Sequence, residues 1–201
     1  SDKGGVDMLS RLREALRFQR DGIIRSASGL KSVRVQAAVA MLLALNVVLS
    51  YFGSFYLSPE IKVSTSFLAL SSTAYLFGPI PAALSGALTD VIQYFLRPAG
   101  PYFPGYTVSG ILGGLIYGAC LYRREGKALL VGIPLSKLLI NLLVNIVLNT
   151  LWLHLLNGAP FFAMLPARAL KNAVLFPFEA ALMYALTLFL AKNRSRILPG
   201  L

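Results

Sequence analysis

Charged residues are scarce in this sequence: only 13% of its 201 residues are Asp, Glu, Lys or Arg. Soluble domains average about 25% charged and about 45–50% apolar residues. Here 56% of the residues are hydrophobic, and the mean hydropathy is +0.68. Cysteine is nearly absent as well, because the single Cys120 cannot form an intramolecular disulfide and favours no cellular compartment. The composition therefore excludes an ordinary soluble domain and indicates an integral membrane protein.

Residues for catalysis and metal binding are also lacking. The one histidine, His154, has no neighbouring Cys/His or His/Glu cluster with the spacing of metal ligands. The sequence contains neither the nucleophile motif Gly-x-Ser-x-Gly nor the phosphate-binding motif Gly-x-x-x-x-Gly-Lys. We therefore expect no enzymatic activity and no cofactor. Any uphill transport would take its energy from another subunit.

Six hydrophobic segments are candidate membrane spans, and they predict an all-α integral membrane protein with a six-helix bundle. They cover residues 33–51, 64–77, 80–96, 106–122, 128–153 and 168–191. The second segment is short, rich in Ser and Thr, and closed by Gly78-Pro79. We expect it to face protein rather than lipid. The predicted organisation is a cytoplasmic segment over 1–32, a membrane domain over 33–192 and a cytoplasmic tail over 193–201.

The basic residues are distributed unevenly between the two sides of this bundle. With six spans, 14 of the 19 Lys and Arg residues lie in the N-terminal segment, in the loop after the fourth span and in the C-terminal tail. This is the positive-inside pattern, and it places both termini in the cytoplasm. The net charge of +11 is thus mainly a topology signal. Residues 7–20 predict a basic amphipathic helix, which either lies on the inner leaflet or is poorly ordered.

Aromatic side chains concentrate on the predicted outer side. Twelve of the 22 aromatic residues lie in the three outer loops or in the adjoining helix ends, among them Tyr102, Phe103, Tyr106 and Trp152. An interfacial aromatic belt would explain part of this enrichment. The one-sidedness favours a site in which such side chains stack against a flat ligand.

Cationic side chains on the same side are candidates for contacts with an anionic ligand. Arg97 can anchor the third span at the membrane surface, or its forked guanidinium can pair with a ligand carboxylate. Arg168, Lys171 and Asn172 open the sixth span within one helical turn. Two cations beside an outward cavity suit an anion, although membrane anchoring is the alternative, especially for Arg168.

Buried polar residues mark the fifth span. Lys137, Asn141, Asn145 and Asn149 recur at four-residue spacing, and such a stripe either joins helices or lines a cavity. Asp90 lies at a depth that matches Lys137, which predicts an ion pair between them, with Glu179 as the other candidate partner. A proton relay through these groups is a less favoured alternative.

Several short motifs complete the pattern. They are Ala40-x-x-x-Ala44, Phe77-Gly78-Pro79, Ser85-Gly86-Ala87-Leu88-Thr89-Asp90, Gly100-Pro101-Tyr102-Phe103-Pro104-Gly105, Asn149-Thr150-Leu151-Trp152 and Leu165-Pro166-Ala167-Arg168. In this combination the sequence resembles the substrate-binding S components of energy-coupling factor (ECF) vitamin transporters, and most closely the folate-specific ones. The resemblance covers roughly residues 33–192.

The resemblance implies a subunit of a prokaryotic-type plasma membrane that binds folate with high affinity from outside. It would deliver the vitamin inward with a membrane scaffold subunit and two cytoplasmic ATPases. The first outer loop would be the gate, with Phe55, Tyr56 and Lys62, and Ala40 and Ala44 would contact the scaffold. The candidate ligand contacts are Arg97, Tyr102, Phe103, Tyr106, Asn145, Asn149, Trp152, Arg168, Lys171 and Asn172. The alternatives are another flat vitamin, such as riboflavin or a deazapurine, and a proton-coupled carrier.

Overall fold

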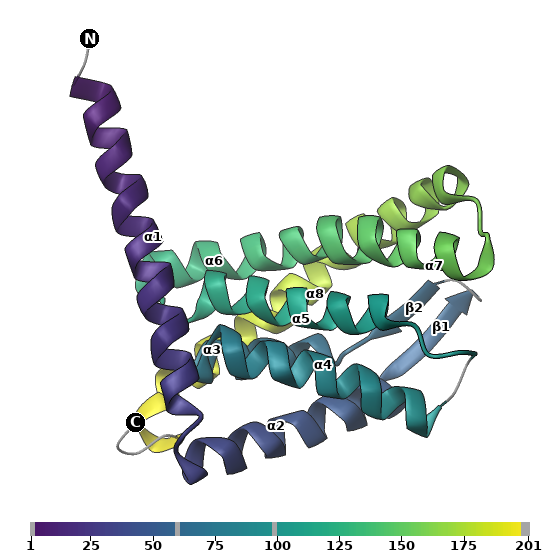
Figure 1. The fold of residues 1–201 in the computed structure, drawn as a ribbon, viewed down its shortest axis with the longest axis horizontal. Coiled ribbons are helices and arrows are strands. Elements are labelled where there is room, and N and C mark those ends of the chain that lie inside the picture. Colours follow the sequence, from purple (N-terminus) through teal and green to yellow (C-terminus); the bar gives the residue numbers. More distant parts are fainter. Residues whose placement is uncertain (1–2, 59–60, 98–99, 198–201) are drawn as a thin grey trace.

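The computed structural model describes residues 3–58, 61–97 and 100–197, and within these the side chains of residues 13–53, 64–97 and 100–197. Helices make up most of this part of the chain. They are α1 (Lys3–Gly29), α2 (Val33–Phe52), α3 (Phe67–Phe77), α4 (Pro79–Leu96), α5 (Pro104–Leu121), α6 (Gly126–Leu139), the π-helix η1 (Ile140–Leu148), α7 (Asn149–Asn157) and α8 (Phe161–Ile197). Helices α2 to α8 form one bundle, and α1 crosses it at one end (Figure 1).

The predicted helical bundle is confirmed, with one addition in the first predicted outer loop. Two short antiparallel strands, β1 (Ser54–Ser58) and β2 (Ile61–Ser64), form a hairpin there, with an irregularity between Tyr56 and Ser58. The strands are rich in aromatic and β-branched residues, which favour extended backbone. The hairpin lies at the end of the bundle where α7 is found, opposite to α1 (Figure 1).

The short helix α3, an apolar helix with three consecutive hydroxyl residues at Ser71, Ser72 and Thr73, lies inside the bundle, as its composition predicted. Every residue from Ser71 to Phe77 is buried. Its hydroxyl groups bond to the backbone of their own helix: Ser72 Oγ donates to Leu68 O at 2.7 Å, and Thr73 Oγ1 donates to Ala69 O at 3.0 Å. The chain reverses at Gly78, whose φ of 94° is a conformation that residues with a side chain rarely adopt.

Helices α4 and α5 approach each other closely through glycine. A Cβ added at Gly114 would lie 2.4 Å from the backbone of Ala82, and one added at Gly86 would lie 2.2 Å from Gly110 O. Such distances leave no room for a side chain between the two backbones. Gly113 is different, because a Cβ there would meet only Leu70 Cδ2 at 3.9 Å.

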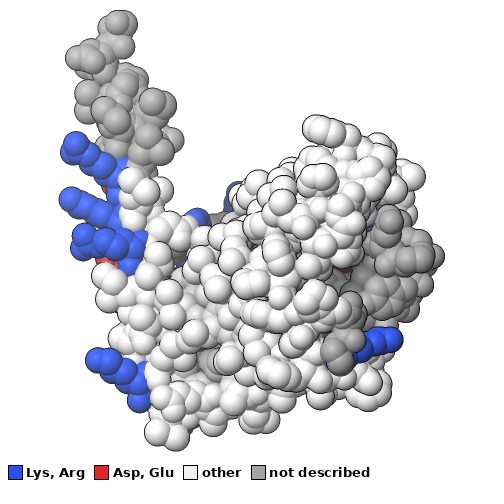
Figure 2. Space-filling model, turned by 45° about the vertical axis from the view of Figure 1, so that its right-hand side comes forward, with Lys and Arg blue, Asp and Glu red and all other residues white. Residues whose placement is uncertain are grey.

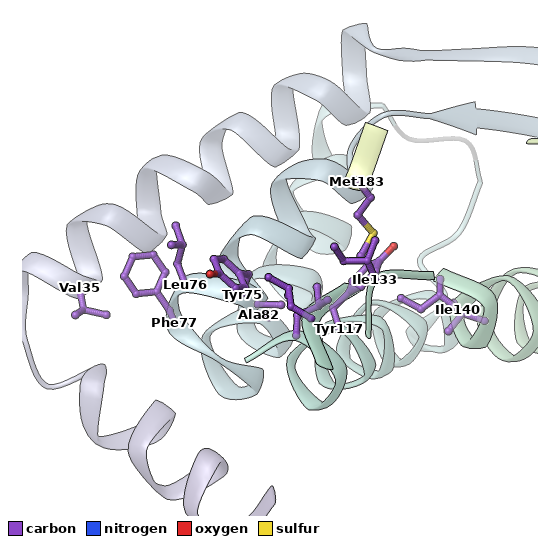
Figure 3. Close-up of a cluster of buried hydrophobic side chains, with 13 residues drawn as sticks. Val35, Tyr75, Leu76, Phe77, Ala82, Tyr117, Ile133, Ile140 and Met183 are labelled. Carbon is purple, nitrogen blue, oxygen red and sulfur yellow. The ribbon is translucent and has the colours of Figure 1, made fainter. Parts of the chain in front are cut away.

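Helix α3 is central to the core of the bundle, because it supplies Ala74, Tyr75, Leu76 and Phe77 to the cluster of buried side chains in Figure 3. Tyr75, Tyr117, Ile133 and Met183 are at most 2% exposed, and they come from α3, α5, α6 and α8. The outer helices bury far less. Only 22% of the most apolar 18-residue stretch of α2 is buried inside the protein, and the share is the same in α8. Apolar side chains on their outer faces therefore have no contact with the protein interior, which is typical of helices in lipid.

Three stretches of the described chain are long and apolar enough to cross a membrane. They are α2, the continuous helix of α6, η1 and α7 over Gly126–Asn157, and α8. Each contains one of the predicted spans, and α3 is a shorter apolar helix. The membrane-protein class is thus confirmed, while the full number of spans and the side on which the termini lie stay predictions.

Candidate ligand-binding cavity

A cavity of about 310 Å³ lies inside the bundle, between η1 and α8 on one side and α2 to α5 on the other. Ligand sites commonly have volumes of about 300–1,000 Å³ and combine apolar walls with a few polar groups. The lining comprises Asn46, Ser64, Ser66, Phe67, Leu70, Gly86, Thr89, Asp90, Gln93, Tyr106, Ser109, Gly110, Gly113, Tyr117, Lys137, Ile140, Val144, Asn145, Asn149, Lys171, Asn172 and Glu179. Both signs of charge and several amides therefore face one space.

A buried ion pair lies in this lining. Lys137 Nζ is 3.0 Å from Glu179 Oε2, and the two side chains are 3% and 16% exposed. The ammonium group also lies 4.1 Å from the centre of the Phe67 ring, where the negative face of the ring attracts it. The predicted Asp90–Lys137 pair is therefore wrong, and the alternative partner Glu179 is correct. Matching depths did not reveal that α6 and α8 bring these two side chains together.

Asp90 instead belongs to a hydrogen-bonded chain with the loop before α5. Thr107 Oγ1 donates to Asp90 Oδ2 at 2.6 Å. The Tyr102 hydroxyl is 2.5 Å from Thr107 Oγ1. Since Thr107 has one hydroxyl hydrogen and gives it to the carboxylate, Tyr102 is the donor to Thr107. The carboxylate of Asp90 is thus held in place at the cavity wall.

Amide groups join η1 to α8 along one side of the cavity. Asn145 Nδ2 donates to Asn141 Oδ1 at 3.0 Å and to Asn172 Oδ1 at 3.4 Å. Asn172 Nδ2 donates to Arg168 O at 2.8 Å, and Arg168 Nη1 donates to Asn145 O at 3.4 Å. The polar stripe of the fifth span therefore both joins helices and lines the cavity, because Lys137, Asn145 and Asn149 face the space while Asn141 is buried behind it.

The π-helix explains why the stripe stays on one face. In an α-helix each four-residue step turns about 40° beyond a full turn, so three steps would rotate the stripe by about 120°. A π-helix has wider turns with i→i+5 hydrogen bonds, and a four-residue step there falls short of a full turn. The opposite rotations of α6 and η1 partly cancel, which keeps Lys137, Asn145 and Asn149 on the cavity side.

An aromatic cluster flanks the cavity where the loop before α5 meets α7. Trp152 Nε1 donates to Ser109 Oγ at 2.9 Å, and Ser109 Oγ donates to Asn149 Oδ1 at 3.0 Å. The Phe103 ring lies between those of Trp152 and Tyr106, at centroid distances of 5.7 and 6.1 Å. Gly105 permits this arrangement, because a Cβ at this position would lie 2.6 Å from Trp152 Cδ2.

The predicted ligand contacts fall into four groups. Those that line the cavity are Tyr106, Asn145, Asn149, Lys171 and Asn172. Three others lie outside the lining and contact a lining residue directly, namely Phe103, Trp152 and Arg168. Tyr102 reaches the lining only through Thr107, which bonds to Asp90. Arg97 is exposed and lies outside the lining, with its guanidinium carbon 5.9 Å from the centre of the Tyr51 ring.

The remaining predicted residues lie elsewhere. The side chains of Phe55, Tyr56 and Lys62 lie outside the described part of the structure, although the backbone places these residues in the β1–β2 hairpin. Ser64 at the end of β2 lines the cavity, so the hairpin adjoins it. Ala40 and Ala44 are exposed on the outer face of α2.

Sequence reasoning missed several lining residues. Asn46 of α2 donates to Thr89 Oγ1 at 3.0 Å, and Gln93 lies one turn further along α4. An amide in the middle of an apolar span is costly in lipid, and Asn46 could have been recognised by that signal. Ser64 and Ser66 were predicted to lie in the second span and to face protein, but nothing in the sequence singled them out as contacts of a ligand. Among the described residues, no group of three or more His, Cys, Asp or Glu side chains could hold a metal ion.

Comparisons of the sequence and of the structure with known proteins point to the same kind of transporter. A family model for the ECF transporter substrate-specific component matches residues 36–193. The chain is 33% identical over 155 residues to a folate transporter FolT of Clostridium novyi, which covers 77% of this chain and 88% of that protein. It is 32% identical over 153 residues to FolT of Leuconostoc mesenteroides, covering 74% and 81%. A crystal structure of FolT bound with folic acid superposes with a TM-score of 0.71 at 34% identity, covering 78% of this chain and 93% of that one.

Proposed function

The chain belongs to the family of ECF transporter substrate-specific components, and from this membership we propose that it captures folate in the cavity described above. Its role is transport and not enzymatic catalysis. The relatives named as folate transporters and the structure bound with folic acid support the choice of folate over riboflavin or a deazapurine.

The observation that carries this proposal is the chemical match between folate and the cavity. Folate combines a flat pterin, a benzoyl group and a glutamate tail with two carboxylates. The cavity combines the aromatic side chains Phe67, Tyr106 and Tyr117 with the cation Lys171 and the carboxylate Asp90. Aromatic walls stack on flat rings, cations bind carboxylates, and a carboxylate accepts the N–H groups of a pterin edge.

We assign roles on this basis. Lys171, with Arg168 beside it, binds the glutamate tail, while Asn145, Asn149 and Asn172 bond to the polar edges of the ligand. Trp152 holds Asn149 in place through Ser109, and Phe103 packs against Tyr106 and Trp152. Tyr102 holds the carboxylate of Asp90 in place through Thr107. Arg97 can bind the glutamate tail of folate only if its guanidinium leaves the Tyr51 ring. We therefore expect Arg97 to contribute less to folate binding than the other residues assigned here.

The same membership supports a transport cycle with other subunits. We propose six spans over residues 33–192 in a plasma membrane, with the segment 1–32 and the tail 193–201 on the cytoplasmic side. The β1–β2 hairpin, including Phe55, Tyr56 and Lys62, gates the outer mouth. The exposed alanines Ala40 and Ala44 let a helix of a scaffold subunit approach α2 closely, and two cytoplasmic ATPases supply the energy.

Equilibrium titration of the detergent-purified chain with folate tests the site. Replacing Lys171 by Ala should weaken binding at least tenfold, because hydrogen bonds to charged groups contribute about 1.5–3 kcal/mol. Replacing Asn149 by Ala should weaken binding by about twofold to tenfold, because a hydrogen bond between neutral groups contributes about 0.5–1.5 kcal/mol. Asn157→Ala is the matched control, since this amide lies on the same helix as Asn149 but is exposed and outside the lining. Unchanged affinity in both site variants would reject the cavity as the folate site.

A further inference from the structure

The hydroxyl group of Tyr117 has no function in the roles assigned above, which use only its ring. The residue lies near the end of α5 and is 1% exposed. Among the described residues, no group forms a hydrogen bond with its hydroxyl oxygen. Most buried polar groups in folded proteins form at least one hydrogen bond, because burying a hydroxyl without one costs free energy. A partner supplied by a bound molecule would remove this cost.

Two residues of the cavity lining carry a buried polar atom without a hydrogen bond to the described part of the chain. They are Tyr117 and Glu179. Glu179 Oε2 lies 3.0 Å from Lys137 Nζ in the ion pair, so its charge is compensated. The hydroxyls of Ser85 and Thr150 have no described partner either, but neither residue lines the cavity. The Tyr117 hydroxyl is therefore the group for which a molecule in the cavity would be the missing partner.

Tyr117 lies at the deep end of the cavity. Tyr106 and Tyr117 both line the cavity and are eleven residues apart on α5, which is about 16 Å along the helix axis. Helix α5 begins at the end of the bundle with the β1–β2 hairpin and runs toward α1 (Figure 1). The Tyr117 ring belongs to the buried cluster that also contains Ile133 and Met183 (Figure 3). This cluster closes the cavity at the end away from the hairpin.

The charges around Tyr117 favour a neutral ligand group. In Figure 2 the Lys and Arg side chains lie mainly along α1, and the described surface of the bundle in this view carries few charges. Inside the bundle, Glu179 lies within electrostatic range of the Tyr117 hydroxyl and is neutralised by Lys137. Lys171 precedes Glu179 by eight residues on α8, which places it about 12 Å nearer to the start of that helix. A ligand carboxylate is therefore favoured at Lys171 and repelled by Glu179.

The pterin of folate is a neutral group with both kinds of hydrogen-bonding atom. Its carbonyl oxygen and ring nitrogens accept hydrogen bonds, and its N–H groups donate them. A tyrosine hydroxyl can donate one hydrogen bond and can also accept. We propose that the Tyr117 hydroxyl binds the pterin by donating to one of its acceptor atoms, so that folate enters the cavity pterin first and leaves its glutamate tail at Lys171. This inference rests on the proposed function and adds to it a ligand-binding residue and the orientation of the ligand.

The substitution Tyr117→Phe tests this role, because it removes the hydroxyl and retains the ring. In an equilibrium titration of the detergent-purified full chain, folate should bind about twofold to tenfold more weakly, since one hydrogen bond to the pterin is lost. The melting temperature without folate should equal or exceed that of the wild type, because the hydroxyl has no described partner to lose. Tyr75→Phe is the matched control. Tyr75 is 2% exposed in the same buried cluster but lies outside the lining, so the affinity for folate should not change.

Fragments of folate test the orientation of the ligand. Pterin and p-aminobenzoylglutamate each represent one end of folate, and their affinities are measured by displacement of labelled folate. Tyr117→Phe should weaken the binding of pterin and leave that of p-aminobenzoylglutamate unchanged. Lys171→Ala should have the opposite effect on the two fragments.

Three results would each overturn this inference alone. The first is a Tyr117→Phe variant that binds folate as the wild type does. The second is a lower melting temperature of this variant without folate, which would give the hydroxyl a structural role. The third is weaker binding of p-aminobenzoylglutamate with unchanged binding of pterin, which would reverse the orientation. Absence of folate binding by the unaltered chain would instead reject the proposed function, and this inference with it.

Discussion

The ion pair between Lys137 and Glu179 allows a sharp test of how the bundle is held together. Glu179→Gln removes the carboxylate and leaves the ammonium of Lys137, which is 3% exposed, with only the Phe67 ring beside it among the contacts described here. Removing one partner of a buried pair costs about 3–5 kcal/mol, because the other charge stays buried without compensation. For a chain of this length about 1 kcal/mol corresponds to about 2–4 °C. We therefore expect the melting temperature to fall by about 6–20 °C.

The assay is thermal unfolding of the detergent-purified protein without folate, so that ligand binding does not contribute. Glu125→Gln is the matched control, because Glu125 is 82% exposed and lies 4.0 Å from Arg194. An exposed pair contributes about 0–1 kcal/mol, so this variant should melt close to the wild type. The double variant Lys137→Met with Glu179→Leu should recover most of the loss, since it replaces both charges by apolar groups of similar volume.

Two results would refute this reasoning. One is a Glu179→Gln variant whose melting temperature equals that of the Glu125→Gln control. The other is a double variant no more stable than Glu179→Gln alone, which would mean that the loss comes from altered packing and not from an uncompensated charge.

Further predictions concern packing, transport and the site. Gly114→Ala should destabilise the bundle by about 1–3 kcal/mol, because its Cβ meets the backbone of Ala82 at 2.4 Å. Gly113→Ala should be tolerated, because a Cβ there meets only Leu70 Cδ2 at 3.9 Å. Equal melting temperatures of these two variants would contradict the close approach of α4 and α5. Ala44→Trp should abolish folate uptake by cells while binding to the purified chain is retained, and normal uptake would exclude this face as the scaffold contact. Trp152→Phe should weaken folate binding less than Lys171→Ala, because Trp152 acts through Ser109; the reverse order in the titration would place the indole in direct contact with the ligand.

Much of the fold could be predicted because apolar runs and glycine–proline breaks are local signals. The reversal at Gly78 and the inward position of α3 followed from a two-residue turn and a row of hydroxyl groups, and both predictions are confirmed. The fifth span was predicted as one segment, but its π-helical middle was not, because a change from i→i+4 to i→i+5 bonding leaves no clear mark in composition. The N-terminal helix, predicted over 7–20, runs from Lys3 to Gly29, since polar residues on its outer face hide how far it continues.

The site was harder to predict than the fold, because its residues meet only in three dimensions. Periodicity placed Asn145 and Asn149 on one helix face, and both line the cavity. The partner of Lys137 depended on how α6 and α8 rotate against each other, which depth alone does not specify. Ser64, at the end of β2, and Ser66, directly before α3, line the cavity, and no motif in the sequence marked them as ligand contacts.

The central claim is that this chain binds folate in its internal cavity, and an equilibrium titration of the purified protein against a panel of vitamins tests it most directly. We predict saturable binding of one folate per chain, with no binding of riboflavin or a deazapurine at the same concentrations. Tight binding of riboflavin without binding of folate would contradict the account of the ligand, while leaving the helical bundle and its family unchanged.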